Sequence, residues 1–166
     1  MHIEYFHASK FGNGVTVAEE FKRQLAGQGV TVSIHHIKDA AARHLPAAGL
    51  YVFSSPGRFG KPIGAMRRFL ARVELPAGTR YAILTTEAAA QPDRKTGRVP
   101  TEEEADRWRR VIPIMNEILQ RKGLSRVAEG KVMVTGVEGP LEEGWQHKVE
   151  VFAAEVLTGA IDHPAR

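Results

Sequence analysis

The chain alternates short apolar runs with longer stretches in which apolar residues recur every three or four positions. Continuous apolar runs are typical of parallel strands that are buried on both faces. We therefore expect strands at His2–Phe6, Val30–Ile37, Leu50–Ser54, Tyr81–Thr85 and Val132–Thr135. The second run differs from the others because its apolar and polar residues alternate, which predicts an edge strand with one wetter face.

Helical spacing of apolar residues predicts helices within residues 17–25, 63–73, 108–119 and 149–157. Thr101 and Glu104 have the spacing of a capping box, which predicts that the third helix begins there. Pro113 lacks a backbone N–H, so we expect a kink or split near Arg109–Pro113. A short additional helix is expected at Asp39–His44.

Strict alternation of strands and helices predicts an α/β fold, a three-layer sandwich in which helices cover both faces of an open parallel sheet. Five strands fit the order 2-1-3-4-5, in which the second strand lies at an edge. The length of 166 residues fits a single domain, 1–166. Such sheets bind ligands at the carboxyl ends of the strands, here between the first and third strands.

Composition narrows the class of protein. Hydrophobic residues make up 43% and charged residues 25%, as in soluble globular proteins. No apolar run approaches the length of a membrane span, and Met1–Glu4 does not begin like a signal peptide. The absence of cysteine excludes disulfides and thiolate chemistry. We therefore expect a protein without membrane association, and the cytoplasm is compatible with this composition.

Charge and histidine placement exclude further classes. The net charge is +4, and Lys and Arg outnumber acidic residues 11 to 5 within residues 1–80. This excess suits anionic ligands, but no arginine-rich or aromatic-interleaved basic stripe predicts nucleic-acid binding. His35 and His36 are adjacent on a strand, so they point to opposite faces and cannot share one metal ion. We expect no metal site.

The segment Ser9–Gly14, SKFGNG, lies between the first expected strand and the first expected helix. Unpaired amides and the positive end of the helix dipole favour an anion there. Gly12 and Gly14 permit close backbone approach, and Ser9 and Asn13 add polar groups. Glycines are also common in plain turns, and no Walker A or GxGxxG motif is present. A phosphate site and a plain turn therefore both remain open for this loop alone.

Two further loops lie at the same edge of the predicted sheet. In SSPGRFGKPIG, Pro56 and Pro62 stiffen the chain and Phe59 offers a flat face to a planar ligand, unless that ring folds into the core. The third loop, EAAAQPDRKTGRVP, is long for a compact domain, strongly charged and free of aromatic residues. It suits a lid or a binding loop.

Together these loops resemble those of the flavodoxin-like proteins, which bind FMN non-covalently. The segment Ser9–Gly14 is similar to the Ser-Lys-Tyr-Gly-Asn-Thr loop of that family, with Gly14 in place of the usual threonine. The segment Ser55–Leu70 is similar to the second flavin loop, especially to the Pro-x-Arg-Phe-Gly segment of flavodoxin-like NAD(P)H:quinone oxidoreductases. The third loop lacks the aromatic residue and glycine-rich turn common there. Flavodoxins are usually acidic, whereas the isoelectric point here is near 9.6.

The resemblance implies a flavodoxin-like fold with FMN as cofactor. The residues implied for the FMN phosphate loop are Ser9, Lys10, Phe11, Gly12, Asn13 and Gly14. Those implied for one side of the flavin ring are Ser55, Pro56, Gly57, Arg58, Phe59 and Gly60. Those implied for the other side are Thr85, Thr86 and Glu87. No catalytic side chain is implied, because the flavin itself carries the electrons.

The resemblance implies a redox protein that transfers electrons from NAD(P)H or a redox protein to an acceptor, for which a quinone is one candidate. Whether the chain is an NAD(P)H oxidoreductase or an electron carrier stays open. The alternative is a flavodoxin-like domain that has lost flavin and serves as a binding or regulatory module, because fold does not fix function. Apolar faces of the third or last helix are either candidate homodimer surfaces or core.

Overall fold

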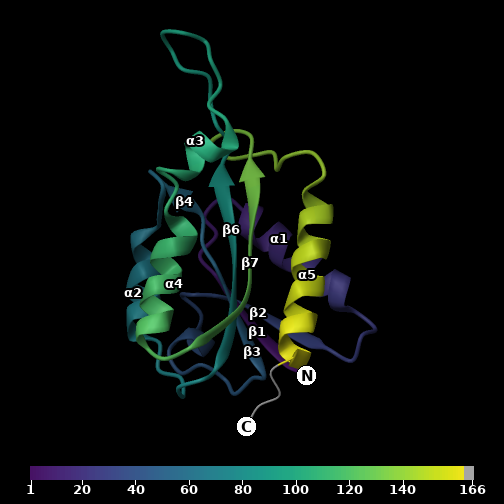
Figure 1. Ribbon diagram of the computed structural model, residues 1–166. Coiled ribbons are helices and arrows are strands. Elements are labelled where there is room, and N and C mark those ends of the chain that lie inside the picture. The colour runs from purple at the N-terminus through teal and green to yellow at the C-terminus, as the bar shows by residue number, and fades with distance from the viewer. Residues whose placement is uncertain (163–166) are drawn as a thin grey trace.

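The computed structural model describes residues 1–162, in which helices flank a five-stranded parallel sheet (Figure 1). The sheet strands are β1 (His2–His7), β2 (Thr31–His36), β3 (Leu50–Ser54), β6 (Arg80–Ala88) and β7 (Ser125–Val134). A two-stranded hairpin comprises β4 (Gly57–Arg58) and β5 (Lys61–Pro62). The helices are α1 (Asn13–Leu25), α2 (Gly64–Arg72), α3 (Glu102–Asp106), α4 (Val111–Arg121) and α5 (Trp145–Asp162), with a 3₁₀ turn η1 (Ala40–Ala42).

The strand order is β2-β1-β3-β6-β7, and every neighbouring pair is parallel. Counted over the sheet strands alone, this is the predicted order 2-1-3-4-5, with β2 at an edge as its alternating pattern predicted. The chain leaves β1 for β2 on one side and later reaches β3 on the other side. The loops that follow β1 and β3 therefore diverge at the carboxyl edge of the sheet, where this topology binds ligands.

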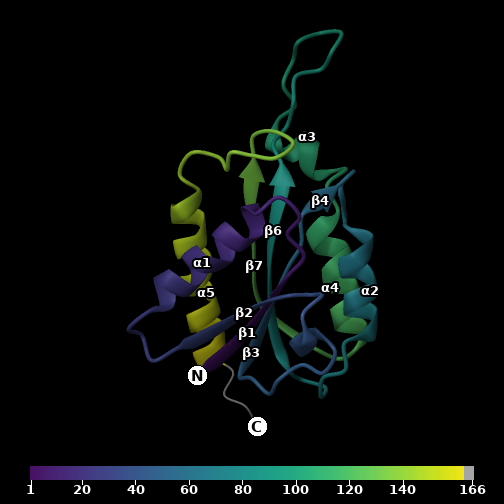
Figure 2. The same cartoon turned by 180° about the vertical axis from the view of Figure 1, so that it is seen from behind.

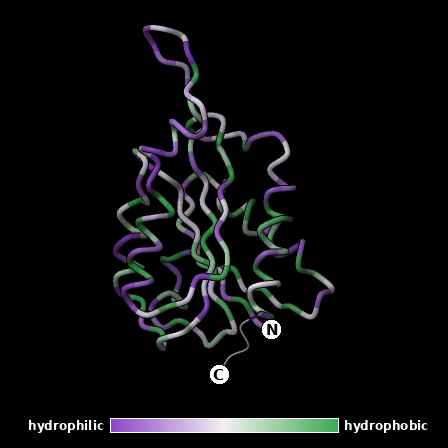
Figure 3. The backbone as a smooth tube through the Cα atoms, viewed as in Figure 1, coloured by the Kyte–Doolittle hydropathy of each residue, from purple (hydrophilic) through white to green (hydrophobic). Residues whose placement is uncertain are grey.

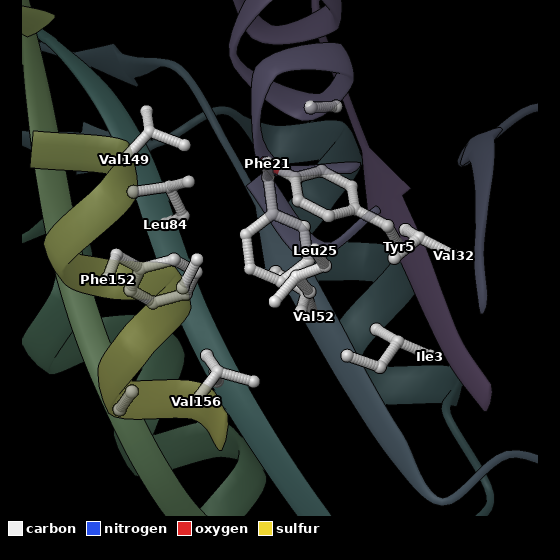
Figure 4. Packing of buried hydrophobic residues seen from close by; sticks show 14 of the residues in the cluster. Ile3, Tyr5, Phe21, Leu25, Val32, Val52, Leu84, Val149, Phe152 and Val156 are labelled. Carbon is white, nitrogen blue, oxygen red and sulfur yellow. The ribbon is translucent and has the colours of Figure 1, made fainter. Parts of the chain in front are cut away.

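Both faces of the sheet are buried, which explains the continuous apolar runs. Helices α1 and α5 cover one face, and α2 and α4 cover the other (Figures 1 and 2). On the first face Phe21 lies between Tyr5 and Phe152, with ring centroids 5.6 and 5.5 Å away (Figure 4). On the second face the ring of Phe6 packs against Phe69 at 5.6 Å. The predicted helical stripes thus form two halves of one core.

The third predicted helix is split in two. Its capping box is confirmed, because Thr101 Oγ1 accepts from the Glu104 amide at 3.2 Å and the Glu104 carboxylate accepts from the Thr101 amide at 3.1 Å. Four residues, 107–110, separate the end of α3 from Val111, where α4 begins. Pro113 is tolerated in the first turn of α4, where an N–H has no intrahelical partner. Trp108 lies in the break and is exposed, so its predicted place on the apolar stripe is wrong.

Two other elements differ from the sequence expectation. Strand β7 begins at Ser125 rather than near Val132, because β7 is an edge strand whose first half carries polar residues. The helix expected at Asp39–His44 is reduced to η1. The β2–β3 connection therefore covers its face of the sheet incompletely. A hollow of about 770 Å³ remains between this connection and the end of α2.

The segment between β6 and α3 projects beyond the carboxyl edge of the sheet (Figures 1 and 2). It is largely hydrophilic, whereas the strands below it include many hydrophobic positions (Figure 3). We call residues 89–100 the projecting loop. Within residues 1–162, no helix combines the length and apolar character that crossing a membrane requires.

Candidate functional site

The loop between β1 and α1 directs backbone amides at a single oxygen atom. Ser9 Oγ accepts hydrogen bonds from the amides of Gly12 at 3.2 Å and Gly14 at 3.1 Å. Gly12 is the N-cap of α1 with φ 90°, a conformation that favours glycine, and the first turn of α1 contains no acidic residue. The N-terminus of α1 therefore presents convergent donors with no competing carboxylate, which suits an anion.

Gly14 leaves room for the Ser9 hydroxyl. A Cβ atom at Gly14 would lie 2.9 Å from Ser9 Cβ and 3.2 Å from Ser9 Oγ, so a side chain at position 14 does not fit beside this serine. Glycine at position 14 therefore lets the Ser9 hydroxyl occupy the space at the start of α1. Thr16 does not contribute, because its Oγ1 donates to the Gly12 carbonyl within α1 at 3.1 Å.

Two histidines hold the backbone of Ser9, a contact that the sequence did not reveal. His7 Nδ1 accepts from the Ser9 amide at 3.2 Å, and His36 Nε2 lies 3.3 Å from the Ser9 carbonyl oxygen, to which it donates. The Lys38 amide donates to His36 Nδ1 at 3.1 Å, which fixes that tautomer. Burial lowers the pKa of His7 to about 4, with a further contribution from His36. His7 is therefore neutral near pH 7 and acts as an acceptor.

The rest of the first loop reaches across to the loop after β7. Asn13 Nδ2 donates to the Glu138 carbonyl at 3.1 Å, so the side chain implied for phosphate instead joins two loops of the carboxyl edge. Lys10 and Phe11 are exposed, and Lys10 Nζ lies 5.7 Å from the ring centroid of Phe11. Lys10 is therefore available to an anion at this loop.

The second loop forms the β4–β5 hairpin, and its tip is Phe59-Gly60. Both residues have positive φ, 51° and 71°, as a type I′ turn requires. The Phe59 side chain is 90% exposed, so it does not fold into the core. The segment before α4 packs against Gly60, and the Arg110 amide donates to the Gly60 carbonyl at 2.6 Å. A Cβ at Gly60 would lie 2.3 Å from the Trp108 carbonyl oxygen, so only glycine fits there.

The base of the second loop packs directly on β6. The Thr86 amide donates to the Ser55 carbonyl at 3.2 Å, and Pro56 forms a parallel bridge with Thr86. A Cβ at Gly57 would lie 2.9 Å from a methyl group of Val111, so glycine is needed there for close packing. The hairpin is thus held by contacts with β6 and α4. A hollow of about 350 Å³ lies beside it, lined by Arg58, Lys61 and Arg67 among others.

The three residues implied for the other side of the ring lie within β6 rather than in a loop. Thr85, Thr86 and Glu87 are all buried, and Thr85 Oγ1 donates to Glu87 Oε2 at 2.6 Å. The strand continues through Ala88, three residues beyond its predicted end. Arg109, which the sequence did not single out, is buried beside this strand end and donates to the Ala88 carbonyl at 3.0 Å.

The structure therefore brings the first two loops to neighbouring strands, with the Ala8 amide donating to the Ser54 carbonyl at 3.2 Å between them. Thr85, Thr86 and Glu87 are buried in β6, where Thr86 binds the base of the second loop. No group of histidine and acidic side chains within residues 1–162 has the arrangement of a metal site. The chemistry available at this edge is anion binding by amides beside an exposed aromatic ring.

No protein-family model matches the chain, and no curated protein matches it. Solved structures do. A flavodoxin from the domain Archaea is similar with a TM-score of 0.70 and 14% identity, over 98% of this chain and 100% of that chain. Flavodoxin 1 from Bacillus cereus is similar with a TM-score of 0.66 and 18% identity, over 99% of this chain and 100% of that chain.

A third solved structure, rubredoxin oxygen:oxidoreductase from Desulfovibrio gigas, has a TM-score of 0.68 and 13% identity, over 97% of this chain but only 36% of that chain. The same architecture therefore occurs both alone and within a larger protein. At these identities the likeness is one of fold. Its whole-length coverage, together with the observed strand order, shows that the chain has the flavodoxin-like fold.

Proposed function

We propose that the chain binds FMN at the carboxyl edge of β1 and β3 and transfers electrons through it. The observation that supports this most directly is the convergence of the Gly12 and Gly14 amides on one oxygen atom at the N-terminus of α1. Backbone amides at a helix N-terminus are the usual donors to phosphate groups. The solved structures with this fold include flavodoxins, which supports a flavin as the phosphate-bearing ligand.

In this proposal the first loop, Ser9–Gly14, holds the phosphate. A phosphate oxygen would take the amides that now bind Ser9 Oγ, and Lys10 would offset its charge. His7 contributes no positive charge near pH 7, since its pKa lies near 4. The hydrogen bonds of His7 and His36 to Ser9 instead keep the Ser9 backbone in place.

The second loop, Ser55–Gly60, would flank the flavin ring, with Phe59 as the exposed aromatic face and Arg58 beside it. The buried residues Thr85, Thr86 and Glu87 would support this loop from behind, since Thr86 already binds it. FMN, when bound, supplies the capacity to accept and release electrons. The protein's residues bind the phosphate, orient the ring and limit its contact with water.

The donor in this proposal is NAD(P)H or a redox protein, and a quinone is a candidate acceptor. Oxidation of NADH or NADPH by the FMN-loaded protein with added benzoquinone tests the reductase form. Turnover above that of free FMN would support a reductase. Turnover equal to that of free FMN would leave electron transfer between proteins as the function.

FMN binding is tested by titrating FMN into the protein and following flavin fluorescence. Gly12→Ala introduces strain at a positive φ inside the site, and Gly27→Ala introduces comparable strain at φ 77° outside it, with open space around both positions. We expect Gly12→Ala to weaken FMN binding about 10-fold and Gly27→Ala to leave it unchanged. Riboflavin, which lacks the phosphate, should bind far more weakly than FMN.

Two results would contradict the proposal. One is the absence of any change in flavin fluorescence at micromolar protein, which would favour a domain that has lost its flavin. The other is equal affinity for riboflavin and FMN, which would show that the first loop does not hold a phosphate.

A further inference from the structure

The segments that follow β1, β3, β6 and β7 at the carboxyl edge of the sheet each present a large apolar side chain to solvent. Phe11 follows β1, Phe59 follows β3, Trp108 follows β6 and Val137 follows β7, with exposures of 52%, 90%, 53% and 87%. Hydrogen bonds join these loops, from Asn13 to the Glu138 carbonyl and from Arg110 to the Gly60 carbonyl. Exposed apolar residues gathered at one edge mark an interaction surface more often than scattered ones do.

The acidic residues near this edge are largely neutralised by ion pairs. The four acidic residues of α3 form the pairs Glu102–Arg109 at 2.9 Å, Glu103–Arg107 at 3.8 Å, Glu104–Arg98 at 2.7 Å and Asp106–Lys131 at 2.6 Å. Glu142, after β7, pairs with Lys148 at 2.6 Å. Asp93 on the projecting loop accepts from the amides of Lys95 and Thr96. In the loops that follow β1, β3, β6 and β7, the remaining acidic residues are Glu138 and Glu143. After β2, Asp39 accepts from the His36 amide at 2.8 Å.

Cations outnumber these remaining acids. In the loops that follow β1, β3, β6 and β7, six exposed cations take no part in an ion pair among residues 1–162, and we call them the free edge cations: Lys10, Arg58, Lys61, Arg94, Lys95 and Arg110. They come from the first loop, the hairpin, the projecting loop and the break before α4. Lys10 and Arg58 each lie 5.7 Å from the aromatic ring beside them in sequence. At two points of this edge a free cation therefore lies next to an exposed aromatic ring.

We propose that this edge docks an acidic redox protein, one whose carboxylates surround its own redox centre. The proposal rests on the proposed electron transfer and names its partner class. Apolar side chains that become buried would stabilise the complex, while complementary charges accelerate encounter and fix orientation. The projecting loop extends this cationic surface beyond the sheet, so its tip would meet the partner first (Figure 1).

Charge reversal on the projecting loop tests this inference away from the flavin-binding residues. The double variant Arg94→Glu/Lys95→Glu changes two free edge cations. Its matched control is Lys22→Glu/Arg43→Glu, which makes the same charge change at exposed positions in α1 and the β2–β3 connection. The probe is a fluorescently labelled acidic iron–sulfur ferredoxin, titrated with the full chain at about 20 and about 200 mM salt.

We expect the wild-type chain to bind this ferredoxin at low salt and to lose affinity at high salt. Arg94→Glu/Lys95→Glu should weaken binding about 10-fold at low salt, and the control variant by less than about 2-fold. Equal weakening by the two variants would overturn the proposal, because it would show only a net-charge effect. Failure of the wild type to bind the ferredoxin would also overturn it.

Two parallel titrations separate the remaining outcomes. Tighter binding to a single-stranded DNA oligonucleotide than to the ferredoxin would show a polyanion surface instead and overturn the proposal. FMN binding is measured on the same variants and should not change, since neither Arg94 nor Lys95 is among the residues proposed to hold the flavin. If FMN fails to bind while the ferredoxin binds at this edge, the proposed function fails and the docking surface stands.

Discussion

At the scale of single residues, His7 connects the proposed site to the stability of the whole chain. Its ring is buried, and its Nδ1 must remain unprotonated to accept from the Ser9 amide. Burial lowers its pKa from the ordinary 6.5 to about 4. Between these two values the unfolded chain binds a proton that the folded chain does not.

Stability should therefore fall as the pH falls from about 6.5 to about 4. The loss attributable to His7 would reach about 3 kcal/mol and then level off, because below pH 4 both states are protonated. His7→Asn keeps an acceptor near the Nδ1 position but does not titrate. Urea unfolding across this pH range should show a shallower decline for His7→Asn; an unchanged decline would assign the acid sensitivity to other groups.

The close approach of Gly14 to Ser9 gives a second prediction at this scale. Gly14→Thr restores the threonine of the family but should destabilise the chain by about 1–3 kcal/mol, because its Cβ would lie 2.9 Å from Ser9 Cβ. Adding Ser9→Gly removes the obstruction, so the double variant should recover at least half of the loss in urea unfolding. Additive effects in this double-mutant cycle would show that the two positions do not compete for the same space.

At the scale of elements, the β4–β5 hairpin carries strain at its tip. Phe59 adopts φ 51°, which glycine tolerates without penalty and phenylalanine does not. Its ring gains no burial in return, being 90% exposed. Strain that persists at an exposed position is expected where a ligand or a partner uses the side chain.

Phe59→Gly should therefore stabilise the chain by about 0.5–1 kcal/mol and at the same time weaken FMN binding. Phe59→Ala is the matched variant, since it removes the ring but keeps the strained Cβ. It should weaken FMN binding similarly without a gain in thermal stability. Unchanged FMN affinity in both variants would remove Phe59 from the flavin site.

Sequence periodicity was sufficient for most elements but not for their ends. The central strands could be predicted because they are buried on both faces. Strand β7 was predicted too short, because the polar residues in its first half interrupt the apolar run. The split between α3 and α4 followed from the capping box and Pro113, but the exposure of Trp108 did not, because periodicity cannot tell a helix residue from one in a break.

The candidate site could be predicted only in part, because sequence patterns show local segments and not the contacts between distant ones. Contiguous residues such as Ser9–Gly14 are visible in the sequence, and the structure confirms their place after β1. Contacts between distant segments are not. His36 reaches Ser9 from the neighbouring strand, and Arg109 reaches Ala88 from the break between α3 and α4, through tertiary packing alone.

At the scale of the whole molecule, two consecutive parts of the chain build the sheet and the core. Residues 1–88 contribute four of the five sheet strands with α1 and α2, and residues 101–162 contribute β7 with α3, α4 and α5. The projecting loop separates β6 from the elements that follow it in the chain, namely α3, α4, β7 and α5. Strand β6 pairs with β7 from Arg80 to Ala88, and α1 packs with α5 on one face as α2 does with α4 on the other. The two parts therefore meet along the β6–β7 ladder, at the α1–α5 and α2–α4 contacts, and where α4 packs on β5 and β6 and α5 packs on β6.

From this division we predict that the folded chain tolerates cleavage of the projecting loop. Arg94, Lys95 and Arg98 are exposed there, so brief trypsin treatment should cut at the loop first. The two fragments should co-elute at the size of the intact protein and separate only in denaturant; separation under native conditions would contradict this. Fragments expressed separately should then reassemble by complementation, with β6 of one fragment pairing with β7 of the other.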